Sequence, residues 1–270
     1  MKRLKKIIPA ILLSGVMALS LVGCGDSKDE SAKDLEKIKE KGEVVLGTSA
    51  DYPPFEFMDK EGNFLGMDIE IAKELAKDMG VELKIQDMQF ESLITALNAN
   101  KVDMILSGMN PTEERRENVD FSDIYYESKH FMIVREADLD KIKKEEDLKG
   151  KKIGVQLGTT QEKLAKEKFK DSEFEVLPAI PDLIMLLENN KVDAVVTEDA
   201  VAENYANVND KLSLNGLSYE DSESGVSVAV RKNNPELVEQ LNKTIKRLND
   251  EGKIKEFYNE AVEISSAKSK

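Results

Sequence analysis

Short apolar runs alternate with stretches of helical periodicity along most of the chain. Between Met67 and Met79 the apolar residues recur at the spacing of one helix face, and Gly80 ends the pattern. Residues 81–85 then alternate between apolar and polar, as a half-buried strand does. Read in this way, the chain predicts strands at residues 44–47, 81–85, 102–106, 152–155, 174–177 and 192–196, and helices at residues 67–79, 90–100, 160–169 and 181–190. Strands that alternate with helices indicate the α/β class with largely parallel sheets.

One segment of this pattern occurs twice. Residues 97–107 (LNANKVDMILS) match residues 187–197 (LENNKVDAVVT) without a gap at an offset of 90, with five identities in eleven positions. Each copy ends a predicted helix, turns through Asn-Lys and enters a buried strand. Two copies are too few for a solenoid, so the repeat predicts two lobes of like design.

Two apolar segments that each end on an arginine flank the second lobe. Residues 131–135 precede it and residues 226–231 follow it, and we expect them to cross between the lobes as a pair of hinge strands. Residues 235–262 predict two helices, separated by Gly252, that return to the first lobe. The predicted organisation is a first lobe of residues 43–133 and 226–266, a second lobe of residues 134–225, and a ligand cleft between them.

The first 23 residues differ from the rest. A basic head is followed by an almost wholly apolar run over residues 7–22, about as long as a signal-peptide core. The run ends at Leu21-Val22-Gly23-Cys24, which resembles the lipobox of bacterial lipoproteins and implies acylation of Cys24. The alternative is a secretory signal with an incidental cysteine. We expect a lipoprotein signal peptide (1–23), a lipid anchor at Cys24 and a polar tether (24–42) that runs into a short helix.

Net charge and chemistry narrow the function. After the leader, 35 basic residues face 53 acidic ones, a net charge of −18, which makes nucleic acid and anionic lipid unsuitable partners. Cys24 is the only cysteine and His130 the only histidine. Serine-elbow, P-loop and GxGxxG motifs are absent, and no acidic spacing marks a metal site. We therefore expect no catalytic residue, no metal and no cofactor.

Three loops at predicted strand ends suit ligand binding better. Residues 47–57 carry two prolines and several aromatic residues, and residues 107–115 offer small residues, open backbone N–H groups and Arg115. Residues 154–161 do the same in the second lobe, with Thr159-Thr160 at a helix start. Helix N-termini and arginine both favour a carboxylate. The three loops predict a site in the cleft for an anionic group.

These loops and the segments around them also contain sequence motifs that resemble those of a known family. The segments YPPFEF (52–57), GMDIEIA (66–72), DFSDIYY (120–126), DLKGKKIGV (147–155) and VDAVV (192–196) resemble the family 3 extracellular solute-binding proteins, the receptors of polar amino-acid ABC importers. The resemblance covers about residues 44–262. It implies the type II periplasmic-binding-protein fold, a free amino acid as ligand, and an ABC permease and ATPase as partners. With the lipobox it implies a monomer anchored by lipid at the extracellular face of the cell membrane, on a Gram-positive surface by preference or in the periplasm of a Gram-negative cell.

The resemblance also implies roles for individual residues. Arg115 matches the arginine that grips the α-carboxylate, and the backbone at Thr160 matches its second-lobe partner. Glu198 matches the acid, usually Asp, that pairs with the α-ammonium, although Asp199 is a rival. Tyr52 and Phe90 match aromatics that sandwich the ligand side chain. The full set expected to bind ligand is Ser49, Tyr52, Phe90, Ser107, Gly108, Asn110, Arg115, Gln156, Thr159, Thr160 and Glu198.

Besides Glu198, two positions in this set depart from the family pattern. Asn110 stands where Thr or Ser is usual, and Ser49 stands where histidine- and glutamine-binding relatives carry Asp. The wording of residues 48–54 and 154–158 is similar to arginine/lysine receptors of Gram-positive bacteria. We therefore favour arginine or lysine, with glutamine or cystine as alternatives.

The expected mechanism is hinge closure, in which the ligand binds one lobe and then bridges to the other. Two other functions remain open on the same fold. One is an enzyme similar to cyclohexadienyl dehydratase, which would need a general acid or base in the cleft. The other is a sensor or adhesin that has lost transport.

Overall fold

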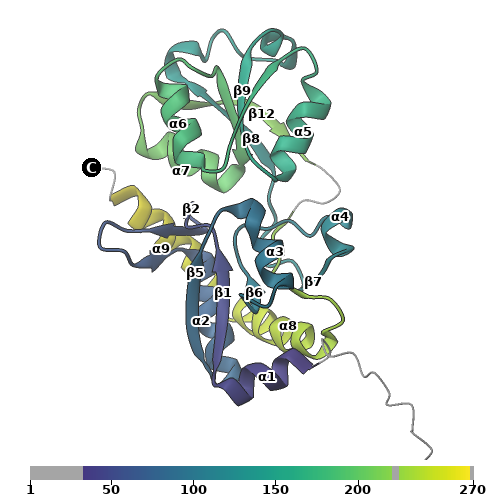
Figure 1. Cartoon of the computed structure of the whole chain (residues 1–270). Coiled ribbons are helices and arrows are strands. Elements are labelled where there is room, and N and C mark those ends of the chain that lie inside the picture. Colours follow the sequence, from purple (N-terminus) through teal and green to yellow (C-terminus); the bar gives the residue numbers. More distant parts are fainter. Residues whose placement is uncertain (1–32, 221–224, 268–270) are drawn as a thin grey trace, which may run out of the picture. The chain divides into compact units, whose positions relative to one another are not determined.

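The computed structural model describes residues 33–220 and 225–267 of the 270-residue chain (Figure 1). The predicted signal peptide, Cys24 and the first part of the tether lie outside these residues. Within the described ranges, no helix is both long enough and apolar enough to cross a bilayer.

The first sheet has the strand order β5-β1-β6-β13-β7. β1 is parallel to both β5 and β6, whereas β13 is antiparallel to both β6 and β7. The strands are Glu82–Asp87 (β5), Glu43–Thr48 (β1), Met104–Ile105 (β6), Ala229–Arg231 (β13) and Val119–Phe121 (β7). The sheet is thus parallel on one side only, because the strand that arrives last in the sequence enters it antiparallel.

The helix α2 (Met67–Met79) shows how the pattern sets this fold. Its apolar face includes Ile69, Ile71 and Leu75, all 0% exposed, and it packs on β1 and β5. Gly80 ends the helix in the left-handed region at φ 74° and donates its N–H to Ala76 O. The predicted helix of residues 67–79 is confirmed. The first lobe also contains α3 (Leu93–Asn98), α8 (Pro235–Asp250) and α9 (Lys253–Ala267), the last two being the predicted helix pair at the C-terminus.

The second sheet has the strand order β10-β9-β11-β8-β12. β9 is parallel to β10 and β11, and β8 is antiparallel to β11 and β12. The strands are Glu173–Leu177 (β10), Lys152–Gln156 (β9), Ala194–Glu198 (β11), His130–Arg135 (β8) and Leu212–Tyr219 (β12). Around this sheet Figure 1 shows the helices α5 (Thr160–Lys168), α6 (Ile180–Glu188) and α7 (Asp199–Val208). Both sheets are mixed, so the expectation of largely parallel sheets is wrong.

Shorter elements escaped the hydrophobic pattern because they span too few residues for a period to show. A three-stranded sheet is formed by β2 (Asp51–Tyr52), β3 (Glu56–Met58) and β4 (Phe64–Leu65). The predicted helix of residues 90–100 begins as a 3₁₀ turn, η2 (Phe90–Ser92), before α3. The remaining short turns of helix are α4 (Glu113–Arg116), η3 (Glu136–Asp138) and η4 (Glu145–Leu148).

The two segments expected to pair as hinge strands do not pair with each other. His130–Arg135 lies wholly in the second sheet and Ala229–Arg231 lies in the first, so residues 130–133 belong with the second sheet. The chain crosses just before each of these strands, where Tyr126 and Val226 form an antiparallel bridge. Strand pairing within each sheet satisfies more backbone groups than a free crossing pair could, which shortens the crossing to a few residues.

The expected tether is also too long. Residues 34–41 form a helix, α1 (Asp34–Lys41), that packs on β1 and α8, with Ile38 2% exposed. Asp34 is buried and paired with Arg231. In the sequence, the spacing of Leu35 and Ile38, three positions apart, was the only sign of this helix, because its other positions are charged.

Candidate ligand-binding site

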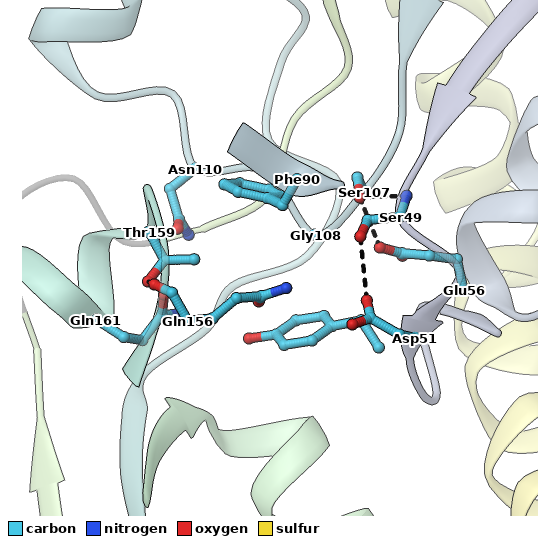
Figure 2. A pocket seen from close by; sticks show the side chains of 11 residues that line it. Ser49, Asp51, Glu56, Phe90, Ser107, Gly108, Asn110, Gln156, Thr159 and Gln161 are labelled. Atoms are coloured by element: carbon cyan, nitrogen blue, oxygen red, sulfur yellow. Dashed lines mark hydrogen bonds between the residues drawn. The ribbon is translucent and has the colours of Figure 1, made fainter. Parts of the chain in front are cut away.

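A pocket lies where strands of both sheets end. Ser49 follows β1, Ser107 and Gly108 follow β6, and Gln156 is the last residue of β9. Figure 2 shows these side chains around the pocket together with Phe90 and Thr159. Its lining consists of Ser49, Asp51, Tyr52, Glu56, Phe90, Ser107, Gly108, Asn110, Gln156, Thr159 and Gln161. The carboxyl ends of strands in α/β sheets are where ligands of such folds bind.

Asn110 connects this lining to the three predicted residues outside it. Its Nδ2 donates to Glu198 Oε1 (2.8 Å), and its Oδ1 accepts from Thr160 Oγ1 (2.9 Å). Its backbone carbonyl accepts from Arg115 Nη1 (2.9 Å). All eleven residues expected from the sequence therefore line the pocket or bond to a residue that does. Asp51, Glu56 and Gln161 line it without having been in the predicted set.

Arg115 sits at the end of the short helix α4. Thr112 caps this helix by accepting from Arg115 N at 3.1 Å. The guanidinium lies 5.1 Å from the Phe90 ring centroid and donates from Nη2 to Gly158 O (3.1 Å) in the second lobe. The Arg115 guanidinium is thus held beside the pocket by the Phe90 ring and by backbone carbonyls of both lobes, on a helix that Thr112 caps.

Glu198 is a fully buried acid beside the pocket. It ends β11, and its side chain is 0% exposed. Oε1 accepts from Asn110 and from Ser128 Oγ (3.3 Å), whereas Oε2 has no hydrogen-bond partner among the described residues. Oε2 lies on the side of Gly108, where an added Cβ would come within 3.9 Å of it. Burial, with a smaller contribution from Asp199, raises the pKa of Glu198 to about 8.

Asp199, the rival of Glu198, faces elsewhere. Its Oδ1 accepts from Ala200 N (2.8 Å) in the first turn of α7, and its own N–H donates to Lys129 O. Of the two adjacent acids, only Glu198 contacts Asn110 in the described structure.

Tyr52 reaches across the pocket to the second lobe. Its Oη bonds with Thr197 Oγ1 (2.9 Å) and accepts from Glu198 N (3.2 Å). The ring edge lies against Gly108, whose φ of 54° and lack of a Cβ allow the approach; a Cβ there would be 3.1 Å from Tyr52 Cδ1. Tyr52 therefore fixes the position of the pocket wall as well as lining it.

Asp51 links the lobes at the other end of the pocket. Oδ1 accepts from Ser49 Oγ (3.1 Å), a bond drawn in Figure 2, and Oδ2 accepts from Ile180 N (3.2 Å) at the first turn of α6. A carboxylate at a helix N-terminus is favoured by the exposed N–H groups and the helix dipole. Burial raises the pKa of Asp51 to about 6, so it is mostly ionised at pH 7.

Two buried acids support the pocket floor. Ser107 Oγ donates to Glu56 Oε1 (2.8 Å), a contact visible in Figure 2, and Gly108 N donates to Asp68 Oδ2 (3.0 Å). Tyr125 Oη also donates to Asp68 (2.8 Å). Burial and the charge of Asp68 hold the pKa of Glu56 well above its usual range, and burial raises that of Asp68 to about 6. In the sequence these acids were visible only as carboxylates within two largely apolar segments, residues 52–57 and 66–72.

In the second lobe, Thr159 is the N-cap of α5. Its hydroxyl accepts from Glu162 N (3.2 Å) and donates to Gln156 O (2.7 Å), so it shapes the loop. The Gln156 amide donates to Pro178 O (2.9 Å). No group of three or more His, Cys, Asp or Glu side chains in the described residues is arranged to hold a metal ion.

Two α/β lobes with a pocket of polar and aromatic side chains at their strand ends are an arrangement that suits the binding of a small solute. The chain belongs to the bacterial extracellular solute-binding proteins, family 3, whose model matches residues 44–263. It is 42% identical to the arginine-binding extracellular protein ArtP of Bacillus subtilis (strain 168), over 92% of this chain and 94% of ArtP. It is 31% identical to the L-cystine-binding protein TcyJ of Escherichia coli (strain K12), over 89% and 90% of the two chains.

Solved structures agree with the sequence relatives. The crystal structure of the amino-acid ABC transporter substrate-binding protein AbpA from Streptococcus pneumoniae, bound to L-arginine, superimposes with a TM-score of 0.83 at 35% identity. The match covers 85% of this chain and 98% of AbpA. The predicted family and the two-lobed fold are confirmed.

Proposed function

We propose that the protein is the substrate-binding lipoprotein of an amino-acid ABC importer, with L-arginine as its preferred ligand. The family supports an amino acid as the ligand, because the members compared above are named as amino-acid-binding proteins. The arginine-binding relatives support the choice of ligand.

One observation carries the proposal. Arg115 and Glu198, a cation and a buried acid, both bond to Asn110, and Glu198 Oε2 has no hydrogen-bond partner among the described residues. A buried carboxylate oxygen without a donor is unfavourable until a cationic group reaches it. An α-amino acid supplies a carboxylate for Arg115 and an ammonium for Glu198 within one small group.

The rest of the pocket suits a cationic side chain. Tyr52 and Phe90 offer flat aromatic faces, on which a guanidinium stacks well. Asp51 brings an ionised carboxylate to the lining, bonded to the Ser49 hydroxyl. A negative charge in the lining attracts a cationic side chain more strongly than a neutral one such as that of glutamine, so we place arginine and lysine ahead of glutamine and cystine.

Ligand capture by hinge closure follows from the same contacts. Asn110 bonds to Thr160 and Glu198, and Arg115 bonds to Gly158, so groups that face the pocket already join the two lobes. A ligand that adds bonds to both lobes favours the arrangement in which they meet. The importer would recognise that arrangement.

Location and anchoring are proposed from the sequence. The lipobox-like ending at Cys24 supports a lipid-anchored monomer on the extracellular face of the membrane, beside its permease and ATPase. We do not propose an enzyme, because the relatives compared are binding proteins.

Isothermal titration calorimetry with arginine, lysine, glutamine, cystine and histidine tests the proposal. We expect arginine to bind tightest and Arg115→Ala to weaken it by at least about 100-fold, because a charge-assisted pair is lost. Arg116→Ala is the matched control. Arg116 lies on the same helix, contacts a phenylalanine ring at 5.3 Å and donates to Pro111 O, yet it bonds to no residue of the pocket lining. Unchanged affinity in Arg115→Ala, or no binding of any amino acid, would overturn the proposal.

A further inference from the structure

A closed ring of hydrogen bonds joins four segments behind the pocket. Asn110 Nδ2 donates to Glu198 Oε1 (2.8 Å) and to Gly225 O (2.9 Å). Gly225 N donates to Ser128 Oγ (3.3 Å), and Ser128 Oγ donates to Glu198 Oε1 (3.3 Å), which closes the ring. All four residues are buried.

The four members come from four different parts of the fold. Asn110 belongs to the loop after β6 in the first lobe, and Glu198 ends β11 in the second. Ser128 and Gly225 lie on the two segments that connect the lobes, beside the bridge between Tyr126 and Val226. Any movement of one lobe relative to the other must pass through these connecting segments, so the ring ties Glu198 to the point about which such movement occurs.

We propose that Ser128 is a positioning residue that links ligand binding at Glu198 to the two segments connecting the lobes. Ser128 does not line the pocket, and its hydroxyl uses its one proton on Glu198 while it accepts from Gly225. Its direct bond to a group that we expect to touch the ligand is the one to the Glu198 carboxylate. This inference rests on the proposed function, because it needs a cationic group at Glu198 Oε2.

The physical link is the charge of Glu198. Burial favours the neutral form of this carboxyl, and a bound ammonium would favour the ionised form. Hydrogen bonds to an ionised carboxylate are roughly twice as strong as those to a neutral one. Occupation of Oε2 by a cation therefore strengthens the Ser128 and Asn110 bonds to Oε1, and these bonds hold the connecting segments together.

The test compares L-arginine with 5-guanidinopentanoic acid, which is arginine without its α-amino group, by calorimetry. We expect Ser128→Ala to lower the affinity for arginine by about tenfold, because one charge-assisted hydrogen bond is lost. The affinity for the deamino analogue should stay within about twofold of its value in the unmodified protein. Ser128→Thr keeps the hydroxyl and should bind arginine as the unmodified protein does.

Ser122→Ala is the matched control. Ser122 is as buried as Ser128, at 5% exposed, and its hydroxyl also accepts a backbone N–H of the opposite connecting segment, that of Val228 at 2.9 Å. It has no contact with Glu198 in the described structure. A general loosening of the connecting segments would therefore affect both variants, whereas the proposed link affects only Ser128→Ala.

Hydrogen exchange gives an independent readout. Arginine should slow exchange of the amide of Gly225 in the unmodified protein and in Ser122→Ala, but not in Ser128→Ala. The deamino analogue should not slow it in any of the three. Equal losses of both ligands in Ser128→Ala, or equal effects of the two serine variants, would overturn the inference while the proposed function stands. Failure of the unmodified protein to bind any amino acid overturns the proposed function and the inference with it.

Discussion

The two copies of the repeated helix–turn–strand corner are built alike but anchored differently. In each copy an arginine on the antiparallel neighbouring strand donates from Nη1 to two backbone carbonyls, one in the helix and one just before the buried strand. The pairs are Arg231 with Leu97 O (3.2 Å) and Val102 O (2.6 Å), and Arg135 with Leu187 O (2.8 Å) and Val192 O (2.6 Å). The acceptors stand 90 positions apart, as the sequence repeat requires.

The anchoring of the two arginines is where the copies differ. Arg231 Nε donates to Asp34 Oδ2 (2.6 Å), which lies 197 positions away on α1 and has a side chain only 4% exposed. Arg135 Nε donates to Asp138, three positions along the chain. The first corner is therefore tied to α1, an element distant in the sequence, whereas the arginine of the second corner pairs with an acid three positions away. A repeated scaffold can carry a long-range contact in one copy without its pattern changing.

The largest effect expected from this difference is on stability. Arg231→Ala leaves the buried Asp34 carboxylate with only its longer ion pair to the exposed Lys37 (3.7 Å), and removing one partner of comparable buried pairs destabilises by about 3–5 kcal/mol. Arg135→Ala loses the two carbonyl bonds, but Asp138 is more exposed and keeps Lys141, so we expect a smaller loss of about 2 kcal/mol. Urea denaturation followed by circular dichroism measures both.

A double variant separates the pair from the corner. If Arg231 matters chiefly through Asp34, then Asp34→Ala added to Arg231→Ala should restore part of the lost free energy of unfolding. Equal destabilisation by Arg231→Ala and Arg135→Ala would contradict the contrast between the two corners.

These corners also mark what the sequence could predict. The repeat, α2 and the strand ends follow from local periodicity and from the turn residues, which act over a few positions. The bond between Asp34 and Arg231 joins residues 197 apart, and nothing local distinguishes Asp34 from the other acids of α1. The predicted tether was too long for this reason.

The same limit applies to the site. The sequence motifs of the family located Arg115 and Glu198. They also showed that Asn110 replaces the Thr or Ser that is usual at this position. The sequence could not indicate that Asn110 and Glu198 touch, because they are 88 positions apart and come from different lobes. Glu56 and Asp68 were missed because burial, which sets their protonation, is a property of the folded chain.

The strands that follow the two corners end at different kinds of side chain, and only one of them ends at an ionisable group. This difference predicts that the affinity for arginine depends on pH, an effect of intermediate size. β6 leads to Ser107 and Gly108, whereas β11 leads to Glu198 with a pKa of about 8. An ammonium binds the ionised carboxylate, so the affinity for arginine should be full above pH 8. Below pH 8 it should fall by up to about tenfold per pH unit, since a proton must leave on binding.

Calorimetry between pH 6 and 8.5 in two buffers of different ionisation enthalpy detects this proton. Asp199 and Asp68 raise the Glu198 pKa, and Asn110 and Ser128 lower it. His130 lies opposite Glu198 in β8. Glu198→Gln should bind arginine weakly but with no pH dependence between 7 and 8.5. Asp51→Asn is the control for the acid of the pocket lining whose pKa is about 6. A slope that persists in Glu198→Gln would assign the proton to another group.

The smallest expected effect tests how alike the two corners are. Asn100 and Asn190 turn each corner in the left-handed region, at φ 56° and 57°, and both are exposed. Alanine in this conformation is disfavoured by roughly 1–2 kcal/mol, because its Cβ approaches the following carbonyl oxygen and no side-chain amide compensates. Asn100→Ala and Asn190→Ala should therefore destabilise the protein by about 1 kcal/mol each and by equal amounts in urea denaturation. Asn→Gly at either position should be nearly neutral, since glycine adopts this φ without strain. A clear difference between the two alanine variants would mean that the corners share a sequence pattern but differ in how much of the stability depends on them.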